Sequence, residues 1–557
     1  MSFVNHDRIS KGPWQAFERM IVRMLHHSKG WKSIQHTGRR GDKGCDVLAI
    51  TPKGQDVVIQ AKFTSTSSGI GEKAVNEIRT ACDHYDTRYG ILATNYRASQ
   101  SAKKRIEMLG SLGYKILVWD GQKLLEMGRT IDKSPTNAKI PREYQEEAVE
   151  KVFEKFERKN RALVEMATGL GKSIVLAEVA RRYLDADSGR KVLLLAHSVP
   201  LLTQLEKSIW SQLPAEIPTH LWHGSEKPSS FEGVTVAMFQ SLISWIKQGV
   251  KLPEFDLVMV DEAHHSPAHT YREVLDSISK DVIMGTTATP WRNDKRDLRD
   301  IFGEPVFQMG IIEGMERGFL SRVDYELYTD DVKWDIVEEL SRKNLTIGQL
   351  NSKLFIPTRD DELALQIREK WDKLSKPKTI TFCKTKKHAQ SFSELLNSMG
   401  VSSRIFVSDL EMADRAKTIM DFENGKFSNI VVVDLLNEGI DVPDVSLIIF
   451  ARVTHSRRIF IQQLGRGLRI KEGKENIVHV MDFVADIRRA SEALKMNREA
   501  RERGEKGAEY YRGEGAKIVK FEDQKTESFF DEYLADCADL EERDKVKLDF
   551  VDADIFE

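Results

Sequence analysis

This chain of 557 residues has few cysteines and no long apolar run. Its four cysteines (Cys45, Cys82, Cys383 and Cys537) lie far apart without paired metal-ligand spacing, so the sequence supports neither a disulfide framework nor a zinc site. No stretch approaches the roughly 18 consecutive apolar residues of a membrane span, and the first residues lack the apolar core of a secretory signal. We therefore expect a cytoplasmic protein without membrane segments.

The formal net charge is only −2, but the charge is unevenly distributed. Residues 1–135 carry 22 Lys and Arg against 13 Asp and Glu, whereas residues 485–557 carry 14 against 21. A basic N-terminal segment suggests a polyanionic partner, although a solvated charged face is the alternative. For the acidic C-terminal segment we favour a solvated helix over a self-inhibitory mimic of a polyanion.

The length predicts three or four domains, and the apolar patterns suggest where they lie. Residues 12–28 show helical spacing, and two strand-like runs, 44–50 and 56–63, are separated by Pro52 to Gly54, which predicts a hairpin. A helix near 71–84 and a strand over 89–95 follow. This order predicts a small α/β domain.

Two further units contain buried-strand runs that alternate with helical segments, which predicts parallel sheets. These runs are KVLLLAH, VTVAMF, DLVMV and VIMGTT in the first unit, and TITFC, SRIFV, NIVVVD, VSLIIFA and IVHVMDF in the second. The predicted class is α/β throughout. The predicted divisions are an N-terminal α/β domain (1–132), two parallel-sheet lobes (133–325 and 326–484) and a charged, helical C-terminal extension (485–557).

Two short motifs predict a nucleotide site. MATGLGKS (Met166 to Ser173) is a glycine-rich turn whose backbone N–H groups and Lys172 suit the phosphates of a nucleotide, with Ser173 placed to bind magnesium. VDEAHH follows the buried run FDLVMV, so that Asp261 and Glu262 are expected to reach this magnesium and a water molecule. Together the motifs predict an ATPase that uses ATP and Mg²⁺, with Thr168, Gly169 and Gly171 in the phosphate loop. No ligand cluster accompanies His264 and His265, which argues against zinc.

Most of residues 140–484 resembles the two RecA-like lobes of a superfamily-two helicase of the DEAD/DEAH-box type. The resemblance rests on motifs in a fixed order: PREYQ, MATGLGKS, LLLAHSVPLL with Gln204, MFQSL with Gln240, VDEAHH, TTATP, TITFCKT, LLNEGIDVP and QQLGRGLR.

The resemblance implies roles for individual residues. Gln145 would read the adenine, Asp441 would lie at the nucleotide, and Arg466 and Arg469 would stabilise the charge of the transferred phosphoryl group. Closure of the cleft by ATP and its opening after hydrolysis would then produce stepping along a nucleic-acid strand. For Gln145, Gln204 and Gln240, a capping or bridging role within the fold remains the alternative.

The N-terminal domain contains the residue types that phosphodiester hydrolysis requires. Gln60 and Lys62 are two positions apart in one predicted strand and therefore share a face, which Asp46 can reach. An oxygen-bound magnesium ion and a lysine that stabilises the developing negative charge would serve such a reaction. Asp46 and Gln60 are the candidate metal ligands. Two alternatives remain: a nuclease-like domain that only binds DNA, or a hairpin in which these residues occur by chance.

Residues 10–128 resemble the Mrr-type branch of the PD-(D/E)xK nucleases, in which a glutamine replaces the acidic residue before x-Lys. The replacement removes one charge from the metal site. Glu18, within AFERM, matches a position at which that family often carries another acid.

A nuclease ahead of a motor resembles the motor subunit of ATP-dependent restriction enzymes, although this chain is much shorter. We therefore predict an ATP-dependent DNA helicase or translocase with Mg²⁺-dependent endonuclease activity that restricts foreign DNA. A repair or recombination helicase with a non-cutting first domain is the alternative, and an RNA helicase is a weaker one. Sequence specificity is expected to come from elsewhere, such as a partner protein, and the oligomeric state stays open.

Overall fold

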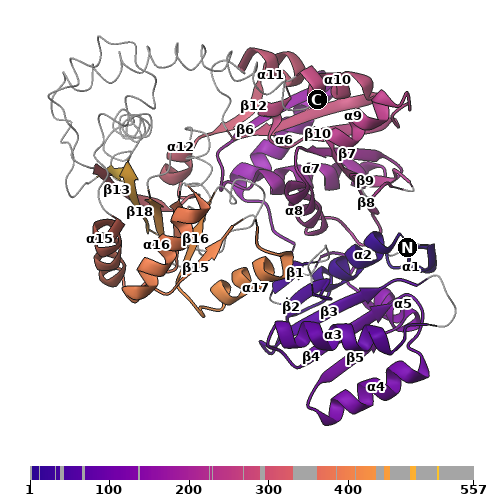
Figure 1. The fold of residues 1–557 in the computed structure, drawn as a ribbon. Helices are drawn as coiled ribbons and strands as arrows, with labels where there is room; N and C mark the ends of the chain where they lie inside the picture. The colour runs from indigo at the N-terminus through magenta and orange to yellow at the C-terminus, as the bar shows by residue number, and fades with distance from the viewer. Residues whose placement is uncertain are drawn as a thin grey trace.

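The structure is a computed structural model with three β-sheets, each accompanied by helices (Figure 1). It describes residues 3–11, 13–31, 33–37, 43–64, 69–135, 138–224, 226–228, 230–266, 269–288, 295–329, 360–383, 385–407, 409–433, 445–451, 477–484 and 511–513. The predicted α/β class is confirmed. Of the helices within these ranges, none is long and apolar enough to cross a bilayer.

The N-terminal domain is built on a five-stranded sheet of order β1-β2-β3-β4-β5. Its elements are α1 (His6–Lys11), α2 (Trp14–His26), β1 (Ser33–His36), β2 (Val47–Ile50), β3 (Asp56–Lys62), α3 (Glu72–His84), β4 (Tyr89–Thr94), α4 (Gln100–Ser111), β5 (Lys115–Trp119) and α5 (Gly121–Thr130). Strands β1, β2 and β3 pair antiparallel, whereas β4 and β5 extend the sheet in parallel. The predicted hairpin is therefore β2–β3, and its turn contains Gly54 at a φ of +80°.

The first lobe contains a seven-stranded, wholly parallel sheet of order β12-β6-β11-β10-β7-β9-β8. Its elements are α6 (Glu143–Arg158), β6 (Arg161–Met166), α7 (Lys172–Ala186), β7 (Lys191–Ala196), α8 (Val199–Trp210), β8 (Thr219–Trp222), β9 (Gly233–Met238), α9 (Phe239–Lys247), β10 (Phe255–Val260), η1 (Ala263–His265), α10 (His269–Ser277), β11 (Lys280–Thr287), α11 (Lys295–Phe302), β12 (Pro305–Met309) and α12 (Ile311–Glu316). The four predicted strands are β7, β9, β10 and β11.

The second lobe contains another parallel sheet of seven strands, in the order β15-β16-β14-β17-β18-β13-β19. Its elements are β13 (Arg322–Thr329), α15 (Asp360–Lys373), β14 (Thr379–Cys383), α16 (Lys386–Ser398), β15 (Ser403–Phe406), α17 (Met412–Glu423), β16 (Asn429–Val432), β17 (Leu447–Ala451), β18 (Ile477–Val484) and β19 (Tyr511–Gly513). Strand β13 crosses the predicted boundary at 325/326, and the division into domains stays our interpretation. Of the predicted helical extension over 485–557, the structure describes only β19, which is a strand.

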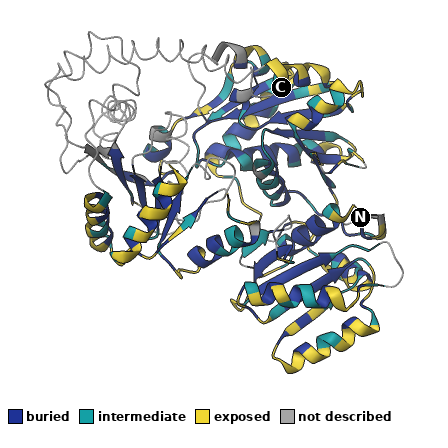
Figure 2. Ribbon diagram, in the orientation of Figure 1, coloured by how far each residue is buried: buried dark blue, intermediate teal, exposed yellow. Residues whose placement is uncertain are grey.

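The buried strands form the cores of the three units, while the helices expose their outer faces (Figure 2). All five residues of β14 and of β17 are buried, as expected for parallel strands covered on both faces. In parallel sheets, ligands bind beyond the carboxyl ends of the strands. Strands β6, β10 and β11 end at Met166, Val260 and Thr287, and these ends bring the nucleotide motifs of the first lobe to one edge.

The N-terminal domain packs against both lobes. Trp210 and Ala215 of the first lobe belong to the same buried apolar cluster as Phe17 and Ile21 of α2. On the second lobe, α17 lies beside the N-terminal sheet (Figure 1) and contributes Ala413 and Met420 to a cluster with Cys45 and Leu48.

Candidate active sites in the first lobe and the N-terminal domain

The predicted phosphate loop connects β6 to the first turn of α7. Gly169 and Gly171 have φ angles of +93° and +80°, which L side chains rarely adopt. A Cβ atom at Gly171 would also lie 2.5 Å from Nε2 of Gln145. The loop therefore turns sharply into the N-terminus of α7, where free N–H groups and the helix dipole favour an anion such as a phosphate.

Three predicted residues lie close together beside this loop: Lys172, Asp261 and Glu262. The ammonium of Lys172 is buried, 3.8 Å from Oε1 of Glu262 and 3.4 Å from the carbonyl oxygen of Met166. Glu262 follows Asp261 directly and has a φ of +50°, a left-handed conformation that places both carboxylates at the end of β10.

Asp261 is held by two donors. Its Oδ1 accepts hydrogen bonds from the Thr286 hydroxyl at 2.9 Å and from the backbone N–H of Glu262 at 3.0 Å. Burial and the neighbouring charge of Glu262 raise the pKa of Asp261 to about 6, while Lys172 and the Thr286 hydroxyl oppose the rise. The residues present fit magnesium, which prefers oxygen ligands: Asp261 supplies a carboxylate, Ser173 a hydroxyl in the first turn of α7, and the buried hydroxyl of Thr168 has no partner among the described residues.

The Thr286 hydroxyl gives a test of pH dependence. It stabilises the charged form of Asp261, so Thr286→Val should raise the pKa of Asp261 further above about 6 and leave more of it protonated at any given pH. We expect the acidic limb of ATP turnover, measured as kcat/KM from pH 5.5 to 8.5, to move to higher pH. Titration of ATP itself affects both proteins equally. Thr235→Val, which alters a buried threonine on β9, is the matched control, and an equal shift in both variants would contradict the role.

The predicted adenine reader, Gln145, lies in the first turn of α6 and is buried. Its Nε2 donates to the carbonyl oxygen of Leu170 at 2.8 Å, and its Oε1 accepts from the backbone N–H of Arg142 at 2.9 Å. Both ends of the amide are thus engaged within the fold, where they join α6 to the phosphate loop.

The remaining predicted motor residues are only partly described. Gln204 is half-buried on α8, and Gln240 is exposed on α9 with its Nε2 3.4 Å from the carbonyl oxygen of His197. Asp441, Arg466 and Arg469 lie outside the described residues.

His264 contacts Glu262 and Thr287, and the sequence did not predict these contacts. Its Nδ1 lies 3.3 Å from Oε2 of Glu262 and 3.1 Å from the hydroxyl of Thr287. The position of His264 two residues after Glu262 was visible in the sequence, but its link to β11 was not.

The second candidate site lies in the N-terminal sheet, where Asp46 directly precedes β2 and Gln60 and Lys62 lie on β3. Asp46 and Gln60 are buried, and Oδ2 of Asp46 accepts a hydrogen bond from the backbone N–H of Ala61 at 2.6 Å. The amide oxygen of Gln60 is buried without a partner among the described residues. A divalent metal would satisfy this oxygen, so Asp46 and Gln60 fit the predicted site. The described residues contain no group of three or more His, Cys, Asp and Glu that could bind a metal.

Two further acids that lie against this sheet are Glu18 and Glu77. Glu18, on α2, is buried with Oε2 3.8 Å from Nε2 of His36 on β1. Glu77, which no sequence motif indicated, lies on α3 with Oε2 2.6 Å from Nζ of Lys62 and 3.2 Å from Nε2 of Gln60. Only its place beside the buried helical face of Ala74 and Ile78 could have indicated that it faces the sheet.

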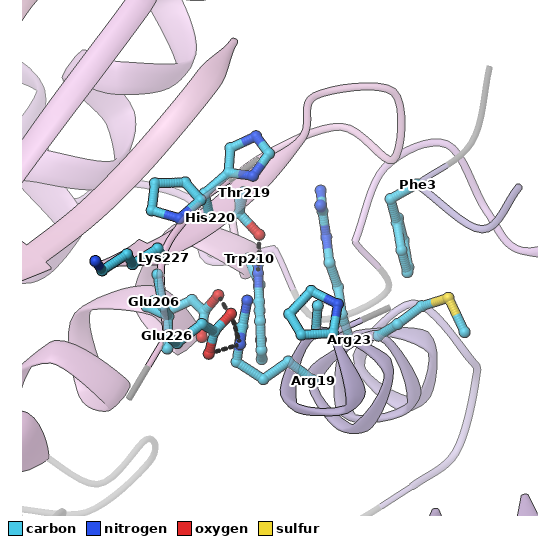
Figure 3. A pocket seen from close by; sticks show the side chains of 14 residues that line it. Phe3, Arg19, Arg23, Glu206, Trp210, Thr219, His220, Glu226 and Lys227 are labelled. Atoms are coloured by element: carbon cyan, nitrogen blue, oxygen red, sulfur yellow. Dashed lines mark hydrogen bonds and ion pairs between the residues drawn. The ribbon is translucent and has the colours of Figure 1, made fainter. Parts of the chain in front are cut away.

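A buried ionic cluster joins the N-terminal domain to the first lobe (Figure 3). Arg19 of α2 donates to Glu206 of α8 at 3.1 Å and to both carboxylate oxygens of Glu226 at 2.5 Å. Burial and the charge of Glu226 raise the pKa of Glu206 to about 7, although Arg19 opposes the rise. Arg23, one turn further along α2, donates to two backbone carbonyl oxygens of the first lobe, at 2.9 and 3.0 Å.

The cluster predicts a stability effect. Arg19→Ala would leave Glu206 and Glu226 buried without their cation, which typically costs about 3–5 kcal/mol. We expect a lower midpoint of urea unfolding and faster proteolytic cleavage between residues 131 and 140, where the N-terminal domain joins the first lobe. Arg79→Ala, which removes an exposed ion pair with Asp83 in the same domain, is the control and should change little. Equal stability of the two variants would argue against the cluster as a docking contact.

Comparison with known protein families gives three matches that follow one another along the chain. Residues 9–128 match the restriction endonuclease family model of the Mrr catalytic domain. Residues 138–292 match the family of type III restriction enzyme res subunits, and residues 361–471 match the conserved C-terminal domain of helicases.

Individual relatives match only part of the chain. The chain is 26% identical over 361 residues to "Putative ATP-dependent helicase IRC3" of Saccharomyces cerevisiae. This match covers 62% of this chain and 52% of the relative. It is 27% identical over 368 residues to the type I restriction enzyme EcoAI endonuclease subunit of Escherichia coli. This match covers 60% of this chain and 45% of that relative. The chain thus spans about half the length of these relatives. A solved structure of the ATP-dependent type ISP restriction-modification enzyme LlaBIII bound to DNA is similar at a TM-score of 0.49 and 20% identity, covering 84% of this chain and 37% of that one.

Proposed function

Because this chain combines a superfamily-two helicase with an N-terminal restriction-endonuclease domain, we propose that it is an ATP-driven DNA translocase that cuts DNA with a magnesium-dependent endonuclease site. Its role would be the restriction of foreign DNA, such as phage DNA, in the cytoplasm. The observation that carries the proposal is the docking of a candidate nuclease sheet on a lobe that contains a phosphate loop, a buried lysine and two adjacent carboxylates.

The geometry of the first lobe supports ATP hydrolysis. Lys172 and the N-terminal amides of α7 would hold the phosphates, and Ser173 and Asp261 would hold magnesium, which neutralises phosphate charge when bound. Glu262, whose carboxylate lies 3.8 Å from the Lys172 ammonium, would orient the attacking water. Since Asp261 is bonded to Thr286 at the end of β11, a change at the nucleotide would also reach the neighbouring strand.

The N-terminal site supports phosphodiester hydrolysis. Asp46 and Gln60 would hold a divalent ion, which activates water and polarises the phosphate when bound. Lys62 would stabilise the negative charge that develops on the phosphate oxygens. The contacts of a motor with phosphates carry little sequence information, so a separate partner protein would provide specificity.

A cleavage assay tests the motor and the nuclease together. The intact protein would be incubated with Mg²⁺ and modified or unmodified plasmid and phage DNA, with and without ATP. We expect ATP-dependent cleavage of DNA that differs between the modified and unmodified substrates, and phosphate release that duplex DNA stimulates. DNA-stimulated ATP turnover without cleavage would favour a repair or recombination helicase whose first domain only binds DNA. Stimulation by RNA alone would favour an RNA helicase.

A further inference from the structure

The amide of Gln60 has a fixed orientation because of its neighbour on α3. A carboxylate accepts hydrogen bonds but has none to donate, so Oε2 of Glu77, 3.2 Å from Nε2 of Gln60, selects the rotamer in which the amide nitrogen faces α3. The amide oxygen then points away from Glu77. This oxygen is the buried atom without a partner among the described residues, and the Gln60 side chain is 1% exposed.

Glu77 is itself held in place. Its Oε2 also lies 2.6 Å from Nζ of Lys62, so one carboxylate oxygen contacts both predicted site residues of β3. The Lys62 ammonium can only donate hydrogen bonds, so it too requires this oxygen to accept. Oε2 of Glu77 is therefore an acceptor toward both side chains.

The backbone leaves little room for another arrangement. Gly44, two residues before Asp46, has a φ of +81°, and a Cβ atom there would lie 3.3 Å from Nε2 of Gln60 and 3.3 Å from the backbone oxygen of Glu77. At this point the loop that precedes Asp46 therefore packs against both the Gln60 amide and α3.

We propose that Glu77 is a positioning residue of the nuclease site, which turns the amide oxygen of Gln60 toward the divalent metal and holds Lys62 beside it. This inference rests on the proposed nuclease function. It explains how a neutral glutamine can serve at a position where related nucleases carry an acid, because the Glu77 carboxylate on α3 orients the Gln60 amide. Loss of such a supporting partner typically lowers metal affinity or activity about 10- to 100-fold.

The test measures Mn²⁺ binding to the nucleotide-free protein by calorimetry, with Asp46→Asn used to identify the binding that belongs to this site. In Glu77→Gln, residue 77 gains a donor, so the Gln60 amide loses its preferred orientation. We expect Mn²⁺ to bind about tenfold more weakly. Glu72→Gln, on the same helix but facing Arg105, is the matched control and should bind as the wild type does.

A double variant that exchanges the residue types at positions 60 and 77 distinguishes an orienting role of Glu77 from a purely structural one. In the double variant Gln60→Glu with Glu77→Gln, the amide on α3 can donate to a carboxylate on β3, which has oxygen at both ends and needs no orientation. We expect this variant to bind Mn²⁺ at least as tightly as the wild type. Far-UV circular dichroism and the thermal midpoint verify that each variant is folded.

The outcomes distinguish the inference from the function on which it rests. Weaker binding in Glu77→Gln and recovery in the double variant would support it. Wild-type affinity in Glu77→Gln, or no recovery in the double variant, would overturn it while DNA cleavage by the wild type still supported the nuclease. A wild type that neither binds Mn²⁺ through Asp46 nor cuts DNA would overturn both.

Discussion

Lys172→Ala and Glu262→Gln are each expected to reduce ATP turnover by at least about a hundredfold, because each removes a group aimed at the reacting phosphate. Lys172 is buried with its ammonium 3.8 Å from Glu262, and its charge also opposes the rise in the pKa of Asp261. Without it, Asp261 would be protonated more readily and would hold magnesium less well. Glu262→Gln keeps the size of the side chain but removes the base that orients water.

The measurement is phosphate release at saturating duplex DNA and ATP, with DNA binding followed separately by fluorescence anisotropy. DNA binding should be largely retained, since neither side chain is expected to contact the strand. Lys251→Ala and Glu254→Gln form the matched controls, because these residues make an exposed ion pair in the same lobe. Turnover at the wild-type rate in either site variant would mean that the nucleotide is hydrolysed elsewhere.

The candidate nucleotide site could be located in the sequence because its residues are adjacent in short motifs. A glycine-rich turn between a strand and a helix requires a local backbone geometry, and the positive φ angles of Gly169 and Gly171 follow from it. The buried runs also predicted most central strands of both parallel sheets. Strands with polar residues were missed, such as β6, in which Arg161 and Glu165 interrupt the apolar pattern.

Contacts between distant segments were not predictable from the sequence. Arg19 meets Glu206 and Glu226 across 187 and 207 residues, and no local pattern distinguishes this arginine from exposed ones. Glu77 likewise reaches Gln60 across the packing of α3 on β3, which depends on the tertiary fold. The nuclease motif therefore indicated Asp46, Gln60 and Lys62 as candidates but not Glu77, which contacts two of them.

The docking of the N-terminal domain adds a physical link between the two candidate sites. Helix α2 contains Glu18, a candidate acid of the nuclease, and in the next position Arg19, which is anchored to α8 of the first lobe. On the other side, Lys43, in the loop leading to Asp46, pairs with Glu411 of the second lobe at 2.7 Å. A relative motion of the lobes would therefore act on both flanks of the nuclease sheet.

Asp46→Asn and Lys62→Ala are expected to reduce DNA cleavage by at least about a hundredfold, with ATP turnover largely retained. Asparagine at position 46 still accepts the hydrogen bond from the Ala61 N–H but lacks the charge that holds a divalent ion. Lys62→Ala removes the ammonium expected to stabilise the developing phosphate charge. The assay follows nicking and linearisation of supercoiled plasmid with ATP and Mg²⁺.

The control for these variants is Lys53→Ala, in the exposed turn of the β2–β3 hairpin, which should cut as the wild type does. Because the ATPase residues lie in another domain, a parallel loss of ATP turnover in Asp46→Asn would indicate misfolding rather than a lost metal ligand. Cleavage that persists in both site variants, with the control unchanged, would mean that the DNA is cut at another site and that Asp46 and Lys62 do not belong to the nuclease centre. A wild type that hydrolyses ATP with DNA but never cuts it would instead favour a first domain that only binds DNA and a motor with a function other than restriction.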